Sequence, residues 1–149
     1  MLRLVLLLNA LWSGAALADA KTLPASACQA TTSSYASSFA ISNGRAQNTS
    51  SSSTISIDCP VIDDTTGGIA SAYVYAYDGS SSAAVECTMY SRYLSSSSSY
   101  ATGTGASAGT GNYRITIGAV SSTNGTHFQH LYCRLPASSY LYGYWVNES

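Results

Sequence analysis

Alternating apolar and polar positions recur along most of the chain and predict short β-strands. Successive side chains of a strand point to opposite faces, so a period of two marks one buried and one exposed face. Clusters of Ser, Gly, Asn and Asp separate the segments that have this period. The seven predicted strands are residues 35–41, 54–62, 70–78, 84–94, 112–120, 128–135 and 140–146.

Seven short strands at this spacing predict an all-β fold, an antiparallel β-sandwich of the Ig-like or jelly-roll-like kind. The candidate core positions share one face of their strands: Ile55, Ile57, Cys59, Val61, Val85, Cys87, Met89, Tyr113, Ile115, Ile117, Ala119, Leu131, Cys133 and Leu135. Asp78-Gly79 predicts a hairpin turn between the third and fourth strands. Residues 95–111 are almost entirely Ser, Gly, Ala and Thr, which predicts a long flexible loop.

The N-terminus has the layout of a secretory signal peptide: one Arg, an apolar run and then small residues. We expect the signal peptide to span residues 1–18, with cleavage after Ala18 or alternatively after Ala20. Residues 19–149 then form a single domain. The apolar run is too short to span a bilayer comfortably, so we expect no membrane span after cleavage.

Four cysteines in an exported chain predict two disulfides, although spacing alone allows three connectivities. If the first two predicted strands form a hairpin, the start of one lies beside the end of the other. That hairpin would bring Cys28 to Cys59. Cys87 and Cys133 both lie in mid-strand among core positions, which predicts the second bond.

The charge pattern argues against several classes of function. Only 9% of residues are charged and the net charge is −1, with no basic patch of the kind that binds nucleic acid. We find no motif for a cofactor or a catalytic serine. His127 and His130 are three residues apart, so on a strand they point to opposite faces and do not share a metal.

Asp63 and Asp64 are weak calcium candidates, because they begin an acidic turn followed by Thr and Gly. The turn does not have the ligand spacing of an EF-hand, and Asp and Gly are also ordinary turn residues.

Two segments place tyrosine on every second residue: AYVYAYDG, residues 72–79, and YLYGYW, residues 140–145. We expect the rings of Tyr73, Tyr75 and Tyr77 to share the exposed face of one strand. The same spacing predicts a second exposed row, which consists of Tyr140, Tyr142 and Tyr144. Two adjacent rows would form an aromatic platform for a glycan or a protein, whereas rows on separate sheets would reflect only the preference of tyrosine for strands.

Three segments centred on the cysteine-bearing strands resemble a group of small exported bacterial proteins of unknown function, found in myxobacteria and their relatives. They are SIDCPVID (residues 56–63), IASAYVYAYDGSSSAAVECTMYSR (69–92) and HLYCRLP (130–136). The resemblance implies export and a disulfide-linked β fold, and it implies no active-site residues.

The sequence therefore favours a secreted, non-catalytic binding or surface module that acts through its tyrosine-rich strand faces. One alternative is a self-associating structural component of an extracellular matrix or cell envelope. A second alternative is a secreted hydrolase that uses scattered Asp, Glu or His side chains.

Overall fold

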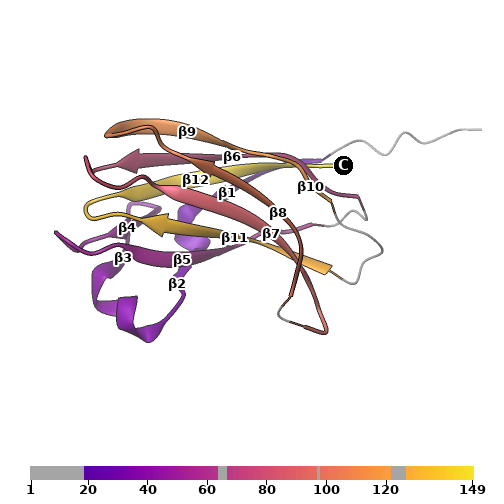
Figure 1. Ribbon diagram of the computed structural model, residues 1–149, viewed down its shortest axis with the longest axis horizontal. Coiled ribbons are helices and arrows are strands. Elements are labelled where there is room, and N and C mark those ends of the chain that lie inside the picture. Colours follow the sequence, from indigo (N-terminus) through magenta and orange to yellow (C-terminus); the bar gives the residue numbers. More distant parts are fainter. Residues whose placement is uncertain (1–18, 64–66, 97, 122–126) are drawn as a thin grey trace, which may run out of the picture.

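The protein folds as two antiparallel β-sheets packed face to face in the computed structural model, with β6, β9 and β12 of the larger sheet above β5, β7 and β11 of the smaller one in Figure 1. The structure describes residues 19–63, 67–96, 98–121 and 127–149. The all-β sandwich with two disulfides that the sequence predicts is confirmed. The described residues contain more strands than the seven expected, because several short segments join the edges of the sheets.

The larger sheet is built around a long central pair, β6 and β12. The strands β9 and β10 both pair with the outer edge of β6, while β1 and β4 share the other edge of β12, and β3 pairs with β4. Its strands are β1 (Ala20–Pro24), β3 (Phe39–Ser42), β4 (Arg45–Asn48), β6 (Gly68–Asp78), β9 (Gly111–Ile117), β10 (Val120–Ser121) and β12 (Tyr140–Glu148).

The smaller sheet has the strand order β2-β5-β11-β7-β8. Two short 3₁₀ helices flank its first strand in the chain, η1 (Ala25–Ala27) before it and η2 (Ser33–Ser38) after it. Its strands are β2 (Gln29–Ala30), β5 (Ile55–Pro60), β7 (Glu86–Tyr93), β8 (Ser99–Ala106) and β11 (His127–Leu135).

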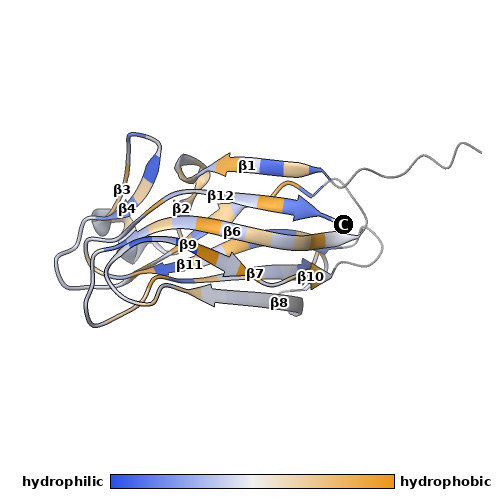
Figure 2. Cartoon of the chain, turned by 90° about the horizontal axis from the view of Figure 1, so that it is seen from above, coloured by the Kyte–Doolittle hydropathy of each residue, from blue (hydrophilic) through white to orange (hydrophobic). Residues whose placement is uncertain are grey.

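The core lies between the two sheets, and Figure 2 shows apolar positions alternating with polar ones along the strands. The strand alternation predicts most of this core correctly, although Ala119 is exposed and Tyr113 and Val61 are only partly buried. Each fully buried Leu, Ile, Val or Met contributes about 1.5–3 kcal/mol through the hydrophobic effect. Fully buried members on the predicted faces are Ile55, Ile57, Cys59, Val85, Cys87, Met89, Ile117, Leu131, Cys133 and Leu135.

Both predicted disulfides are present, but one forms for a different reason from that expected. Cys87 and Cys133 are direct cross-strand partners on β7 and β11. The hairpin expected to bring Cys28 to Cys59 is absent, because β3 belongs to the larger sheet and β5 to the smaller one. The short strand β2 pairs with β5 instead, and its position directly after Cys28 brings that residue to Cys59.

The first predicted strand, residues 35–41, is only partly correct. Its first half belongs to the 3₁₀ helix η2, and only Phe39 to Ser42 form the strand β3. Tyr35 packs against the core from this helix, so an apolar contact is made without extended backbone.

The prediction of a flexible loop over residues 95–111 is also wrong for about half of its length. Residues Ser99–Ala106 form β8, which pairs with β7 at the edge of the smaller sheet. A Cβ atom at Gly103 or Gly105 would collide with the carbonyl oxygen of Gly118 or Thr116, respectively. The small residues that suggested disorder therefore allow this strand to lie against the backbone of the opposite sheet.

Asp78 does not lie in the expected hairpin turn, because β6 and β7 belong to different sheets. Its carboxylate is fully buried and accepts hydrogen bonds from the backbone N–H groups of Ser80 (2.9 Å) and Val85 (3.1 Å). The hydroxyl groups of Ser107 and Ser139 also donate to it. Asp78 thus joins three connections between the sheets at one end of the sandwich.

We expect Asp78→Ala to lower the free energy of unfolding by about 3 kcal/mol, because it leaves several buried donors without an acceptor. Urea denaturation at neutral pH measures the change. Ser81→Ala, at an exposed position in the same connection, is the matched control. Equal midpoints for the two variants would contradict the structural role of Asp78.

Candidate functional site

The two tyrosine-rich strands are direct neighbours at the centre of the larger sheet. β6 and β12 pair antiparallel, with Tyr77 opposite Tyr140 and Tyr73 opposite Trp145. Ala72, Val74 and Ala76 are buried, so the tyrosines of β6 project from the outer face of the sheet. Their rings therefore lie on the surface, as the sequence predicts for this strand.

A β-bulge in β12 interrupts the expected alternation. Leu141 pairs with Ala76 and Gly143 with Tyr75, so Tyr142 is an extra residue without a partner of its own on β6. An extra residue shifts the side chains that follow it to the other face of the strand.

Tyr144 is consequently not part of an exposed row, and this prediction is wrong. Its side chain is 1% exposed, and its hydroxyl group donates a hydrogen bond to the carbonyl oxygen of Pro60 on the opposite sheet. Burial raises the pKa of Tyr144 to about 12, because the charged phenolate is disfavoured away from water. Trp145, which the sequence analysis did not select, takes the outward position instead.

The rings on the outer face of β6 and β12 form one group, which we call the aromatic platform. Five of its six members were predicted from the spacing of tyrosine, and only the tryptophan was missed. Its members are Tyr73, Tyr75, Tyr77, Tyr140, Tyr142 and Trp145.

Ring contacts across the two strands hold the platform together. Tyr73 stacks on Trp145 with ring centroids 5.1 Å apart, and Tyr77 stacks on Tyr140 at 4.9 Å. Tyr142 meets Tyr140 edge to face at 5.1 Å. Aromatic pairs of this geometry contribute about 0.5–1.5 kcal/mol each, so these five rings are ordered before any ligand binds.

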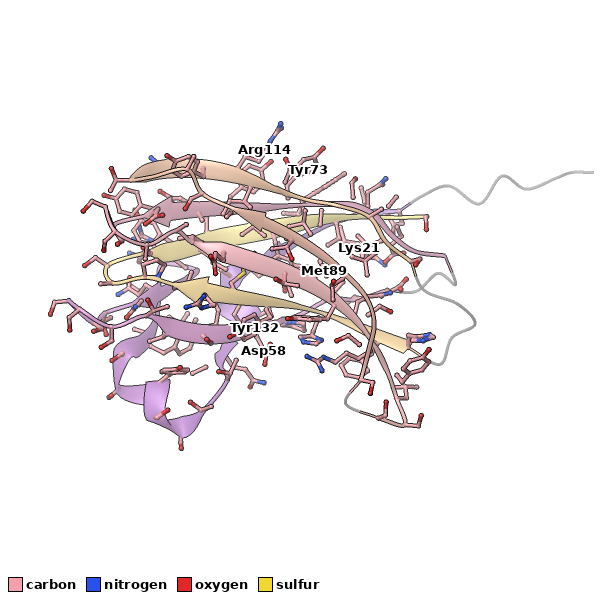
Figure 3. All side chains as sticks on the ribbon, in the orientation of Figure 1. Lys21, Asp58, Tyr73, Met89, Arg114 and Tyr132 are labelled. Carbon is pink, nitrogen blue, oxygen red and sulfur yellow. A yellow bond between two sulfur atoms is a disulfide. The ribbon has the colours of Figure 1, made fainter. Side chains whose placement is uncertain are left out.

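Two arginines flank the platform from neighbouring strands. The guanidinium group of Arg114 on β9 lies 4.7 Å from the centre of the Tyr73 ring, and the two residues lie side by side in Figure 3. Arg45 on β4 lies 4.8 Å from the ring of Tyr140. Both groups add hydrogen-bond donors beside the rings, and the cation–π contacts fix their positions.

Tyr142 lies across β6 and reaches the far strand β9. Its hydroxyl group donates a hydrogen bond to Oδ1 of Asn112 at 2.8 Å, and its oxygen is 3.4 Å from that of Tyr140. The hydrogen bond with Tyr140 is the main reason that the pKa of Tyr142 is raised.

A shallow groove of about 430 Å³ opens at the centre of the platform. Tyr75 and Tyr142, which are 43% and 42% exposed, line it together with Asn112 and Arg114. Tyr75 comes from β6, Asn112 and Arg114 from β9, and Tyr142 reaches the groove from β12. Flat rings, an amide and a guanidinium group are thus presented together to solvent.

The bulge predicts very different roles for two tyrosines that are two residues apart. We expect Tyr144→Ala to lower the free energy of unfolding by about 3–5 kcal/mol, because it leaves a cavity between the sheets. In urea denaturation, Tyr142→Ala should lower this free energy by only about 0.5–1.5 kcal/mol, the contribution of its edge-to-face contact with Tyr140, because its ring lies on the surface. A large loss of stability in both variants, or in neither, would show that the side chains are not divided between the two faces.

The calcium candidates gain no support from the structure. Asp64 lies outside the described residues, so nothing is shown of its position. Within the described ranges, no three His, Cys, Asp or Glu side chains come together as metal ligands.

The two histidines occupy positions of opposite parity on β11 and lie beside different rings. His127 lies against Tyr93, and His130 stacks on Tyr90 with centroids 5.2 Å apart. Nε2 of His130 is 3.8 Å from Oδ1 of Asp58, in a groove on the smaller sheet. Among described residues, Asp58 is the only carboxylate that lines this groove, whereas a glycosidase generally needs two.

Burial lowers the pKa of His130 from its ordinary value of 6.5. The carboxylate of Asp58 acts in the opposite direction, and the guanidinium group of Arg92 lowers the pKa further. The side chain therefore favours the neutral form in the folded protein.

This shift predicts a loss of stability in acid. The unfolded chain binds the proton of His130 more readily, so the contribution of the neutral side chain is present above about pH 6.5 and is lost as the pH falls through the folded-state pKa. We expect His130→Gln to reduce the drop in urea midpoint between neutral and mildly acidic pH. His127→Gln controls for the loss of a histidine from the same strand. An unchanged drop in His130→Gln would contradict the prediction.

Comparison with known proteins adds no family to this description. No protein-family model matches the chain, and no curated protein matches it. The two disulfides are compatible with a location outside the cytoplasm. No helix within the described ranges is long and apolar enough to cross a membrane. The signal peptide, which lies at residues 1–18 outside those ranges, and the resemblance to exported myxobacterial proteins both stay predictions.

Proposed function

We propose that the protein is a secreted, non-catalytic module that binds a glycan on its aromatic platform. The observation that carries this proposal is the adjacency of β6 and β12, whose rings lie on one exposed face and contact one another. Rings on separate sheets would instead have reflected only the preference of tyrosine for β-strands.

The chemistry of the platform suits a sugar ring. The flat faces of Tyr75 and Tyr142 can pack against the C–H groups of a pyranose. The amide of Asn112 and the guanidinium group of Arg114 line the same groove and can bond to sugar hydroxyl groups. A few polar groups beside aromatic walls are typical of sites that fix the orientation of a small ligand.

The ordering of the rings favours binding on entropic grounds. Most of the platform side chains contact another ring or a guanidinium group in the absence of ligand. A ligand that binds there need not immobilise flexible side chains, which would cost about 0.5–1.5 kcal/mol for each one.

A glycan fits this surface better than a protein partner does. Protein interfaces generally have an apolar centre from which charged residues are depleted. The groove instead has Arg114, Asn112 and phenol side chains among the residues that line it. The platform also contains none of the exposed aliphatic side chains, which are Ile41, Ile62 and Leu94.

Affinity electrophoresis through gels that contain neutral polysaccharides, such as xylan, mannan or dextran, tests this function. We expect Tyr75→Ala and Tyr142→Ala each to weaken retention about tenfold, which is the effect of losing about 1.4 kcal/mol of binding free energy at one stacking contact. Tyr93→Ala removes a comparably exposed tyrosine from the other sheet and should bind normally.

Retention that is the same in Tyr75→Ala as in the unmodified protein would reject the platform as the binding surface. Sedimentation analysis separates the structural alternative from glycan binding. A dimer or polymer that Tyr75→Ala dissociates, with no retention by any polysaccharide, would favour a self-associating component of a matrix or envelope.

A further inference from the structure

A second and larger groove lies on the outer face of the smaller sheet, away from the platform. Its volume is about 580 Å³, and its polar lining comes from β2, β5, β7, β11 and the turn after β7. Figure 3 shows Asp58 and Tyr132 on this side of the sandwich and Tyr73 and Arg114 on the other. The lining residues that matter here are Gln29, Asp58, Arg92, Ser96, Phe128 and His130.

The strand register and one disulfide bring these side chains together. Gln29 is the cross-strand partner of Asp58, and Phe128 is the partner of Arg92. The Cys28–Cys59 bond joins the residues that precede Gln29 and follow Asp58. The polar wall of the groove is therefore fixed by covalent and backbone bonds rather than by a loop.

The groove has no net charge of either sign. It contains one carboxylate, on Asp58, and one guanidinium group, on Arg92. Burial lowers the pKa of His130, so its imidazole is mainly neutral at pH 7. A single arginine opposed by a carboxylate does not favour a phosphate or any other strongly anionic ligand.

The rings of Phe128 and His130 form the remaining wall, and Tyr90 supports them from outside the lining. Phe128 is 43% exposed and stacks on His130 with centroids 5.8 Å apart, and His130 stacks in turn on Tyr90 at 5.2 Å. The guanidinium group of Arg92 lies 4.7 Å from the centre of the Tyr90 ring. The two lining rings present an ordered apolar edge beside the amide, carboxylate and guanidinium groups.

We infer that this groove is a second carbohydrate site, which takes a neutral hexose unit of a polysaccharide. An uncharged ligand suits the balanced charges, and a C–H face suits Phe128. Sugar hydroxyl groups both donate and accept, so they can donate to the Asp58 carboxylate and accept from the Arg92 guanidinium group. A groove that opens on the face of a sheet can hold one unit while the rest of the polymer continues beyond it. The inference shares its ligand class with the proposed function but depends on different residues.

The position of the two sites has a consequence for how the protein acts on a polysaccharide. The sheets of a sandwich pack about 10 Å apart, and the two grooves face away from each other. One extended polymer segment cannot lie on both outer faces at once. Together with the proposed function, two occupied sites would therefore hold two different segments of polysaccharide.

NMR of the isotope-labelled full-length mature protein tests the groove directly. The probes are the methyl glycosides of glucose, galactose and mannose, with glycine as a zwitterionic comparison. We expect at least one glycoside to shift the backbone amide signals of Gln29 and His130. Phe128→Ala and Asp58→Asn should each raise its Kd at the groove about tenfold or more. The spectrum of each variant also shows whether it is folded.

Two substitutions serve as matched controls. Arg134→Gln changes an arginine on the same strand face, where it pairs with Glu86 outside the groove. Leu94→Ala removes an exposed apolar side chain near the end of β7. Neither should alter the shifts. An equal loss of binding in a control and in Phe128→Ala would overturn the assignment.

The same titration separates this inference from the proposed function. Shifts at Gln29 and His130 without shifts at Asn112 and Arg114 would support the groove and count against the platform. Shifts at the platform alone would overturn the groove and leave the platform standing. A groove response to glycine and to no glycoside would also overturn the inference.

Discussion

A single β-bulge in β12 decides where the aromatic side chains of this protein lie. Before the bulge, Tyr140 faces solvent beside Tyr77, and after it Tyr144 enters the core while Trp145 stacks on Tyr73. The edge of β12 explains its position, because the strand pairs with β4 up to Leu141 and with β1 from Gly143 onward. Glycine is required there, since a Cβ atom would lie 2.8 Å from the carbonyl oxygen of Leu23.

The bulge serves the core and the surface together. Tyr144 donates a hydrogen bond across the core to the opposite sheet, and Tyr142 extends over β6 toward Asn112. Tyr142, the extra residue of the bulge, lines the platform groove together with Tyr75. On the other sheet, the Cys28–Cys59 bond has a comparable double role, because it secures the short strand β2 and shapes the polar wall of the second groove.

The alternation of apolar and polar residues correctly predicted the strands that have one face buried in the core and the other face exposed. It succeeded for β5, β7 and β11, where Ile57, Met89 and Leu131 alternate with polar residues over regular pairing. It missed β8, because Gly, Ser and Thr carry no hydrophobic signal while their backbone groups still pair with β7. The same alternation did not predict the position of Asp78. Whether two successive strands share a sheet depends on contacts with residues far away in the chain.

The sequence by itself determined the all-β class, the presence of two disulfides and the outward row of tyrosines on β6, because these follow from side-chain period and from four cysteines in the chain. The pairing of β2 with β5, which brings Cys28 to Cys59, came only from the tertiary structure. Only the tertiary structure decided that β6 and β12 are neighbours, that Trp145 replaces Tyr144 on the platform, and that Asp58 and Arg92 share a groove. The physical reason is that strand pairing and register join residues distant in the chain. One unpaired residue, Tyr142, reverses every face that follows it in β12.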